Sequence, residues 1–107
     1  MGAQILAKKH FAKRKAPKTP KQMERHLKGI ANHYRIAMLL LVAKNAGITV
    51  EDIVEALGGN YTNLSIHISK LVQAGLLEKR YKGRNVTHYL TPYGTTVIAF
   101  LKTFQHL

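Results

Sequence analysis

The sequence predicts a mainly α-helical domain of about five helices that carries one small two-stranded β-hairpin. Three observations lead to this fold class. Apolar residues recur every three or four positions through five segments, the spacing that lines one face of a helix. The period changes to two over residues 77–82 and 86–90, on either side of Gly83-Arg84-Asn85, as in a hairpin. Thr, Asn, Gly and Pro residues stand at the ends of the helical segments, where they cap or stop helices.

The composition points to a polyanionic partner. The 107 residues include 17 Lys and Arg against five Asp and Glu, a formal net charge of +12. Such an excess suits nucleic acid or an anionic membrane surface. The length suits one domain, and the absence of cysteine excludes disulfides, thiolate metal sites and cysteine nucleophiles. No apolar run reaches the roughly 20 residues that cross a bilayer, and residues 3–7 are too short for a secretory signal. We therefore expect a soluble, cytoplasmic protein without a membrane partner.

Residues 1–20 are predicted to form a basic N-terminal arm, which is mobile or holds a short helix. Nine of the 17 basic residues lie in residues 1–28. Pro17 and Pro20 separate the arm from a folded domain that covers residues 21–107. Two uses of the arm stay open: it lies along the phosphates of a nucleic acid, or it is a solvated tail that aids solubility.

The first two helices are expected over residues 21–32 and 33–45. The residues of the first helix expected to face inward are Met23, Leu27, Ile30 and Ala31. The second helix is apolar nearly all round between Ile36 and Ala43, and it closes at Gly47. A helix of this kind is central, so we expect it to be buried between other helices or against a second subunit.

A helix-turn-helix unit is expected next. Thr49-Val50-Glu51-Asp52 has the form of a capping box, so a third helix is expected to begin after Thr49. Its apolar stripe consists of Val50, Ile53, Val54 and Leu57. Gly58-Gly59 ends this helix and forms a turn without Cβ clashes, and Asn60 can cap the helix that follows. A short helix, a tight turn with Gly and a second helix form the helix-turn-helix unit.

The second helix of this unit, over residues 61–74, has two unlike faces. Its apolar face consists of Leu64, Ile68, Leu71 and Val72, and its polar face of Thr62, Asn63, Ser65, Ser69 and Lys70. A small protein has no interior use for such a polar face. Joined to a basic hairpin, this helix has the layout of a winged helix-turn-helix DNA reader.

The major groove of DNA admits an α-helix, whose first turn reaches the bases most deeply. Asn63 is the best candidate to read an adenine, because its amide can bond N6 and N7 together. Ile66 lies off the buried stripe, so it either touches a thymine methyl or packs beneath the hairpin. The hairpin supplies cations for the minor groove or its flanking phosphates, although charges on exposed strands also prevent edge pairing.

The last helix is expected to begin at Thr91-Pro92, since Pro fits the first turn of a helix. Its apolar side consists of Val97, Phe100, Leu101, Phe104 and Leu107. We favour packing of this seam on a second copy of the chain over folding back on the first helix, because a homodimer matches two half-sites a helical turn apart.

No enzyme activity, cofactor, metal or small-molecule ligand is expected. The six histidines are nowhere two, three or four positions apart, so a metal site shared between subunits through His106 is the remaining option. The five acidic residues form no catalytic pair, and the sequence has no nucleophile elbow or glycine-rich phosphate loop.

Four segments resemble the ArsR-like winged-helix repressors, with the MarR-like group next closest. They are Leu27-Lys28-Gly29-Ile30-Ala31-Asn32-His33-Tyr34-Arg35-Ile36, Thr49-Val50-Glu51-Asp52-Ile53, Asn63-Leu64-Ser65-Ile66-His67-Ile68-Ser69-Lys70-Leu71 and Ala74-Gly75-Leu76-Leu77. The resemblance implies that Ser65 and His67 contact DNA and that Arg84 is the wing arginine. Ile66 departs from the arginine usual there. Metal sensing is not implied, since the ligands of the family's sensors are missing apart from His106.

The sequence therefore predicts a sequence-specific, double-stranded DNA-binding transcriptional regulator that acts as a homodimeric repressor. The alternatives are a winged-helix protein-interaction module and a non-specific DNA-packaging protein. The residues predicted to contact DNA are Tyr61, Thr62, Asn63, Ser65, His67, Lys70, Arg80, Lys82, Arg84 and Asn85.

Overall fold

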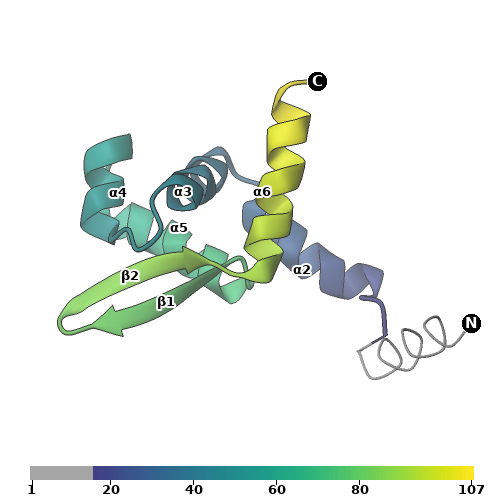
Figure 1. Cartoon of the computed structure of the whole chain (residues 1–107), viewed down its shortest axis with the longest axis horizontal. Coiled ribbons are helices and arrows are strands. Elements are labelled where there is room, and N and C mark those ends of the chain that lie inside the picture. The colour runs from purple at the N-terminus through teal and green to yellow at the C-terminus, as the bar shows by residue number, and fades with distance from the viewer. Residues whose placement is uncertain (1–15) are drawn as a thin grey trace, which may run out of the picture.

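The computed structural model describes residues 16–107, so most of the arm expected over residues 1–20 lies outside the described residues. The elements follow the order α2 (Pro20–Ile30), α3 (His33–Lys44), α4 (Val50–Leu57), α5 (Tyr61–Gln73), β1 (Leu77–Lys82), β2 (Asn85–Leu90) and α6 (Pro92–Gln105) (Figure 1). The two strands pair antiparallel from Leu77 opposite Leu90 to Lys82 opposite Asn85. This arrangement confirms the predicted fold class, a winged helix-turn-helix of five helices and one hairpin within the described residues.

Each described helix is preceded by a capping residue, whose side chain accepts a hydrogen bond from a backbone amide of the first turn. These residues are Thr19, Asn32, Thr49, Asn60 and Thr91. The sequence indicated the starts at Thr49, Asn60 and Thr91. A further capping box, which the apolar pattern did not reveal, joins Thr19 and Gln22 through bonds to each other's backbone amides. For this reason α2 begins at Pro20, one residue earlier than predicted.

The core forms around α3, as its apolar composition predicted. Met38 and Leu39 are fully buried, and α3 packs against α2, α5, β2 and α6. The inward face of α5 adds Leu64, Ile68 and Leu71. The helix-turn-helix unit is thus held on a central helix, which leaves the other face of α5 in solvent.

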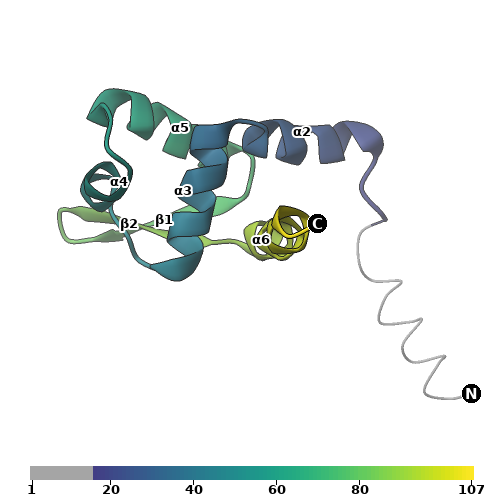
Figure 2. The ribbon, with the colours of Figure 1, turned by 90° about the horizontal axis from the view of Figure 1, so that it is seen from above.

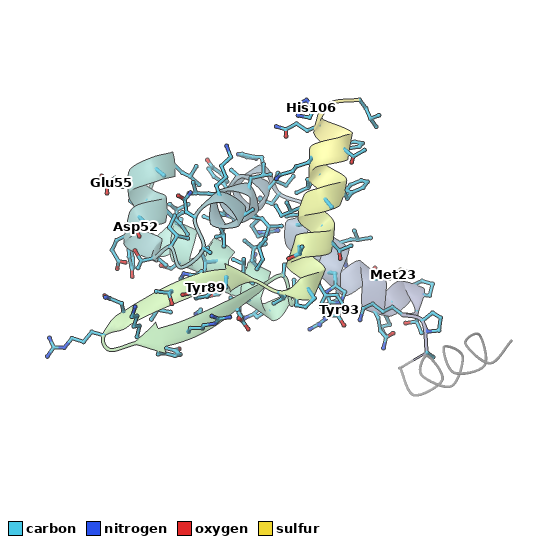
Figure 3. The ribbon with its side chains drawn as sticks, viewed as in Figure 1. Met23, Asp52, Glu55, Tyr89, Tyr93 and His106 are labelled. Carbon is cyan, nitrogen blue, oxygen red and sulfur yellow. The ribbon has the colours of Figure 1, made fainter. Side chains whose placement is uncertain are left out.

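The predicted inward face of α2 is wrong in large part. Ile30 is buried, but Met23 and Leu27 are 44% and 59% exposed and Ala31 is also exposed. The buried polar residue of α2 is His26, whose Nδ1 lies 2.5 Å from the carbonyl oxygen of Ala74 at the end of α5. The hydrogen bond to Ala74 and the packing of Ile30 turn the Met23 and Leu27 side of α2 away from the core. Figure 3 labels Met23 on this helix.

The hairpin is joined to the loop between α3 and α4. The backbone amide and the Nδ1 atom of His88 both bond to the carbonyl oxygen of Ile48, at 3.0 and 2.9 Å, and Gly47 donates to the carbonyl oxygen of His88 at 2.9 Å. At the other end, Gly83 has a φ of 64° in a two-residue turn, the geometry for which glycine is suited. The tip of the hairpin, α4 and the start of α5 lie at the same end of the molecule, away from α2 (Figures 1 and 2).

Close packing of α2 on α5 yields a prediction for stability. A Cβ atom on Gly29 would overlap Cβ of Ala74, so Gly29→Ala must push the two helices apart. We expect Gly29→Ala to lower the free energy of unfolding by about 1–3 kcal/mol, as measured by urea denaturation. Lys28→Ala, at an exposed neighbouring position, should stay within about 0.5 kcal/mol of wild type. An equal stability of the two variants would contradict the tight packing of α2 on α5.

Candidate nucleic-acid interface

The outward face of α5 carries the predicted groove-reading residues. Tyr61, Thr62, Asn63 and Lys70 are exposed, while Ser65 and His67 are half-buried. Asn60 caps the helix by accepting the backbone amide of Asn63 at 3.1 Å. The side chain of Asn63 forms no hydrogen bond with any other part of residues 16–107, so both its donor and its acceptor are available. Tyr61 is directed to α4, where its hydroxyl donates to Glu51 Oε1 at 3.4 Å.

A hollow of about 300 Å³ lies beside the start of α5. It is lined by Tyr34, Gly59, Asn60, Asn63, Leu64, Ile66 and His67. Ile66 is 51% exposed, so the option that it packs beneath the hairpin is wrong. Its side chain instead adds an apolar surface to the polar face of α5.

His67 is held by Arg35, a residue that the sequence pattern did not single out. The guanidinium of Arg35 is buried and donates from Nε to Gly29 O at 2.6 Å, from Nη2 to Lys28 O at 3.4 Å and from Nη1 to His67 Nδ1 at 3.0 Å. Because a guanidinium can only donate, Nδ1 must accept, and a neutral His67 carries its proton on Nε2. The available signal was an arginine directly before the apolar run of residues 36–43. Arg35 thus connects α2, α3 and α5. Its bond to Nδ1 leaves Nε2 as the ring nitrogen of His67 that can bind a partner.

The surroundings of His67 favour its neutral form over its protonated form. Burial lowers the pKa of His67 below its ordinary value of 6.5, and the positive charges of Arg35 and Lys70, together with His33, lower it further. The ring of Tyr34 also stacks on the imidazole, with 5.5 Å between the ring centroids.

These contacts predict a pH dependence of stability. Because the folded pKa of His67 lies below the unfolded value of 6.5, protonation favours the unfolded chain. The stabilising contribution is complete above pH 6.5 and is lost as the pH falls through the folded pKa. His67→Asn places an amide oxygen where Nδ1 accepts from Arg35 but cannot titrate. Urea denaturation between pH 5 and 8 should therefore show wild type losing stability relative to His67→Asn below pH 6.5. Parallel profiles would contradict this coupling.

The four hairpin residues predicted to contact DNA differ in their surroundings. Arg80 donates to Glu78 Oε1 at 2.6 and 3.0 Å and lies 4.0 Å above the ring of Tyr89. The positive charge of Arg80 is therefore largely compensated within the hairpin. Lys82 at the end of β1 and Arg84 in the turn are exposed, and Asn85 begins β2 opposite Lys82. Of these four residues, the two cations without a carboxylate partner among the described residues, Lys82 and Arg84, therefore lie at the tip, while Lys79 is exposed further along β1.

Neither a metal site nor a membrane span is found among the described residues. Within residues 16–107, no group of three or more His, Asp or Glu side chains is arranged to hold a metal ion. No described helix combines the length and the apolar character needed to cross a membrane.

Comparison with known proteins agrees with the fold. Residues 30–80 match a family model described as a helix-turn-helix domain. No curated protein sequence matches the chain. Among solved structures, the chain is similar to the homodimeric winged helix-turn-helix DNA-binding domain (fragment 1–100) of a possible ArsR-family transcriptional regulator from Mycobacterium bovis. The TM-score is 0.73 and the identity 25%, and the match covers 86% of this chain and 91% of that one.

Two further similar structures have lower identity and support the fold alone. Reduced HlyU from Vibrio cholerae has a TM-score of 0.70 at 24% identity, with 78% of this chain and 88% of that chain covered. The transcriptional repressor BigR from Xylella fastidiosa has a TM-score of 0.68 at 18% identity, with 80% and 86% covered. The chain is therefore a winged helix-turn-helix protein with a matched helix-turn-helix domain over residues 30–80, and it resembles the ArsR-family transcriptional regulators.

Proposed function

We propose that this protein is a transcriptional regulator that binds specific sequences of double-stranded DNA as a homodimer and represses transcription. The observation that carries the proposal is the outward face of α5, where the exposed side chain of Asn63 forms no hydrogen bond with residues 16–107 and lies beside the exposed side chain of Ile66. A helix fits the major groove, and an amide and an apolar group are suited to adenine and to a thymine methyl. Repression is the role that the ArsR-like resemblance implies.

His67 has a defined part in this proposal. Since Arg35 occupies Nδ1, the neutral ring offers an N–H donor at Nε2. That donor suits an acceptor on DNA, either a phosphate oxygen or the N7 atom of a purine. Thr62 and Ser65 add hydroxyl groups on the same helix, and Lys70 adds a cation for a phosphate.

The hairpin is proposed to contact the DNA backbone beside the groove that α5 enters. Lys82 and Arg84 are exposed at its tip, which lies at the same end of the molecule as the start of α5. Contacts of this kind fix the register of a protein on the duplex without selecting bases. Arg80, held by Glu78, is assigned a smaller part in affinity than Lys82 and Arg84.

Dimerisation is proposed to use the exposed apolar residues of α2 and α6. Phe100 and Phe104 are each 60% exposed and stack on one another with 5.4 Å between their centroids, and Leu107 is 94% exposed. Met23 and Leu27 of α2 are also exposed in the single chain, and we assign them to the same proposed interface. The similar Mycobacterium bovis domain is homodimeric.

The proposal is tested by selecting duplexes from a random-sequence pool with the purified full chain. We expect enrichment of a two-fold symmetric site whose half-sites lie one helical turn, about 34–36 Å, apart. We also expect affinity to fall steeply with salt. Binding without enrichment would replace the proposal with a packaging role. A lack of binding at low salt would favour a protein-interaction module.

A further inference from the structure

We infer that the C-terminal half of α2 and the end of α5 form a second phosphate-binding surface, which holds DNA backbone beyond the phosphates contacted by the hairpin and by the start of α5. The inference rests on the proposed function. It assigns a DNA-contacting surface to α2, a helix that lies outside the helix-turn-helix unit.

A hollow of about 400 Å³ marks this surface. It is lined by Arg25, Lys28, Gly29, Arg35, Lys70, Gln73 and Ala74. Four of these residues are cationic and none carries a carboxylate. Arg35 is only 9% exposed, so its charge acts within the protein, where it is less screened than a surface charge.

Helix ends meet at this hollow, yet their carbonyl groups do not make it negative. The last carbonyl groups of a helix carry partial negative charge and would repel an anion. Here Arg35 covers the carbonyl oxygens of Lys28 and Gly29, and Arg25 Nη1 donates to Gln73 O at 3.0 Å. His26 Nδ1 bonds to Ala74 O. These side chains therefore offset the partial negative charge of the terminal carbonyl groups. The cationic residues around the hollow then leave it positive.

The two lysines on the rim are available to an anion. The side chain of Lys70 is exposed and its ammonium group forms no hydrogen bond or ion pair within the described part of the chain. Lys28 lies 3.8 Å from Glu24, but the two side chains are 76% and 57% exposed. An exposed pair of this kind contributes little, so a phosphate can compete for Lys28.

The hollow continues the proposed DNA-reading face. Lys70 belongs to both surfaces, and Arg35 bonds directly to His67 on that face. A duplex that lies along the outward face of α5 therefore reaches the hollow at the end of that helix. This continuity favours DNA backbone over a free phosphate compound as the occupant.

The cationic face also extends along α2. Lys21, Arg25 and Lys28 are spaced four and three residues apart, so they share one face of the helix. At a rise of 1.5 Å per residue, this row is about 10 Å long, the axial length of about three phosphates on one strand. Beyond the end of α5, α2 extends away from the helix-turn-helix unit to its own first residue, Pro20 (Figure 2). Cationic helix faces are often merely solvated, but this row borders a hollow with a buried guanidinium.

The test compares wild type with Arg25→Gln/Lys28→Gln on the duplex selected by the wild-type chain. Ethylating the phosphates one at a time identifies those that the protein needs. We expect the double variant to become insensitive at phosphates that matter to wild type and to keep the same base preference. The slope of log K against log salt should become shallower by about 0.9 for each phosphate that the variant no longer neutralises.

Two controls keep the test decisive. Lys44→Gln/Lys102→Gln removes two exposed cations from α3 and α6 and should leave both the slope and the interference pattern unchanged. If Arg25→Gln lowers stability because the bond to Gln73 is missing, Lys21→Gln/Lys28→Gln replaces it. A double variant with the wild-type slope and interference pattern would overturn the inference while leaving the proposed function intact. Absence of any base preference in wild type would instead overturn the proposed function.

Discussion

Gly94→Ala is expected to lower the free energy of unfolding by about 3 kcal/mol or more, a larger loss than that expected for Gly29→Ala. Gly94 is buried in the first turn of α6, and a Cβ atom there would overlap the carbonyl oxygen of Leu76. That oxygen is not free to move, because it accepts the backbone amide of Thr91 at 3.2 Å. The hydroxyl of Thr91 donates to Gly75 O at 2.5 Å and accepts from the amide of Gly94 at 3.0 Å. An added methyl group must therefore break the junction between α5, β1 and α6.

Urea denaturation followed by circular dichroism measures this effect. Thr95→Ala changes the next residue, which is exposed on the same helix, and should stay within about 0.5 kcal/mol of wild type. If Gly94→Ala proved as stable as Thr95→Ala, the junction would be more adaptable than its hydrogen bonds indicate.

Phe100→Asp/Phe104→Asp is expected to convert the proposed homodimer into monomers and to weaken DNA binding by about 10²–10⁴-fold. Both phenylalanines are exposed in the single chain, so the change should spare the monomer fold while placing two charges in the proposed interface. Affinity falls because each reading helix then binds its half-site without the effective concentration that a linked partner provides.

Sedimentation equilibrium measures the mass, and a titration on the selected duplex measures the affinity. Gln105→Asp adds one charge at another exposed position of α6 and should leave the protein dimeric. If the Phe variant remained dimeric, the interface would lie elsewhere. If it became monomeric but bound the duplex as tightly as wild type, dimerisation would not contribute to DNA binding.

The helix positions were predictable because they depend on local chemistry. Caps at Thr49, Asn60 and Thr91 act within one turn, and the 3.6-residue period of α5 fixes which of its residues share a face. The inward face of α2 was not predictable in the same way. The face of that helix that carries Met23 and Leu27 is exposed and the face that carries His26 is buried, and this choice depends on a contact with Ala74, a residue 48 positions away from His26.

The candidate site was predicted in outline, and its details depend on tertiary contacts. The polar face of α5 follows from residues 61–73 alone. The role of Arg35 does not, because its three partners lie on two other helices. For Arg80 a signal was present, since Glu78 lies two residues away and so on the same face of the strand. The surroundings of Ile66 could not be predicted, because they include Tyr34 of α3, which is distant from Ile66 in the sequence.

The most direct test of the proposed DNA reading is the effect of Asn63→Ala on base preference. The measurement compares the binding free energy of the selected duplex with that of duplexes in which each A·T pair is replaced in turn. Wild type should lose about 1–3 kcal/mol at one pair in each half-site, and Asn63→Ala should lose that preference while keeping the salt dependence. If Asn63→Ala discriminated every position as wild type does, α5 would not read the groove through this residue and the proposed interface would be wrong.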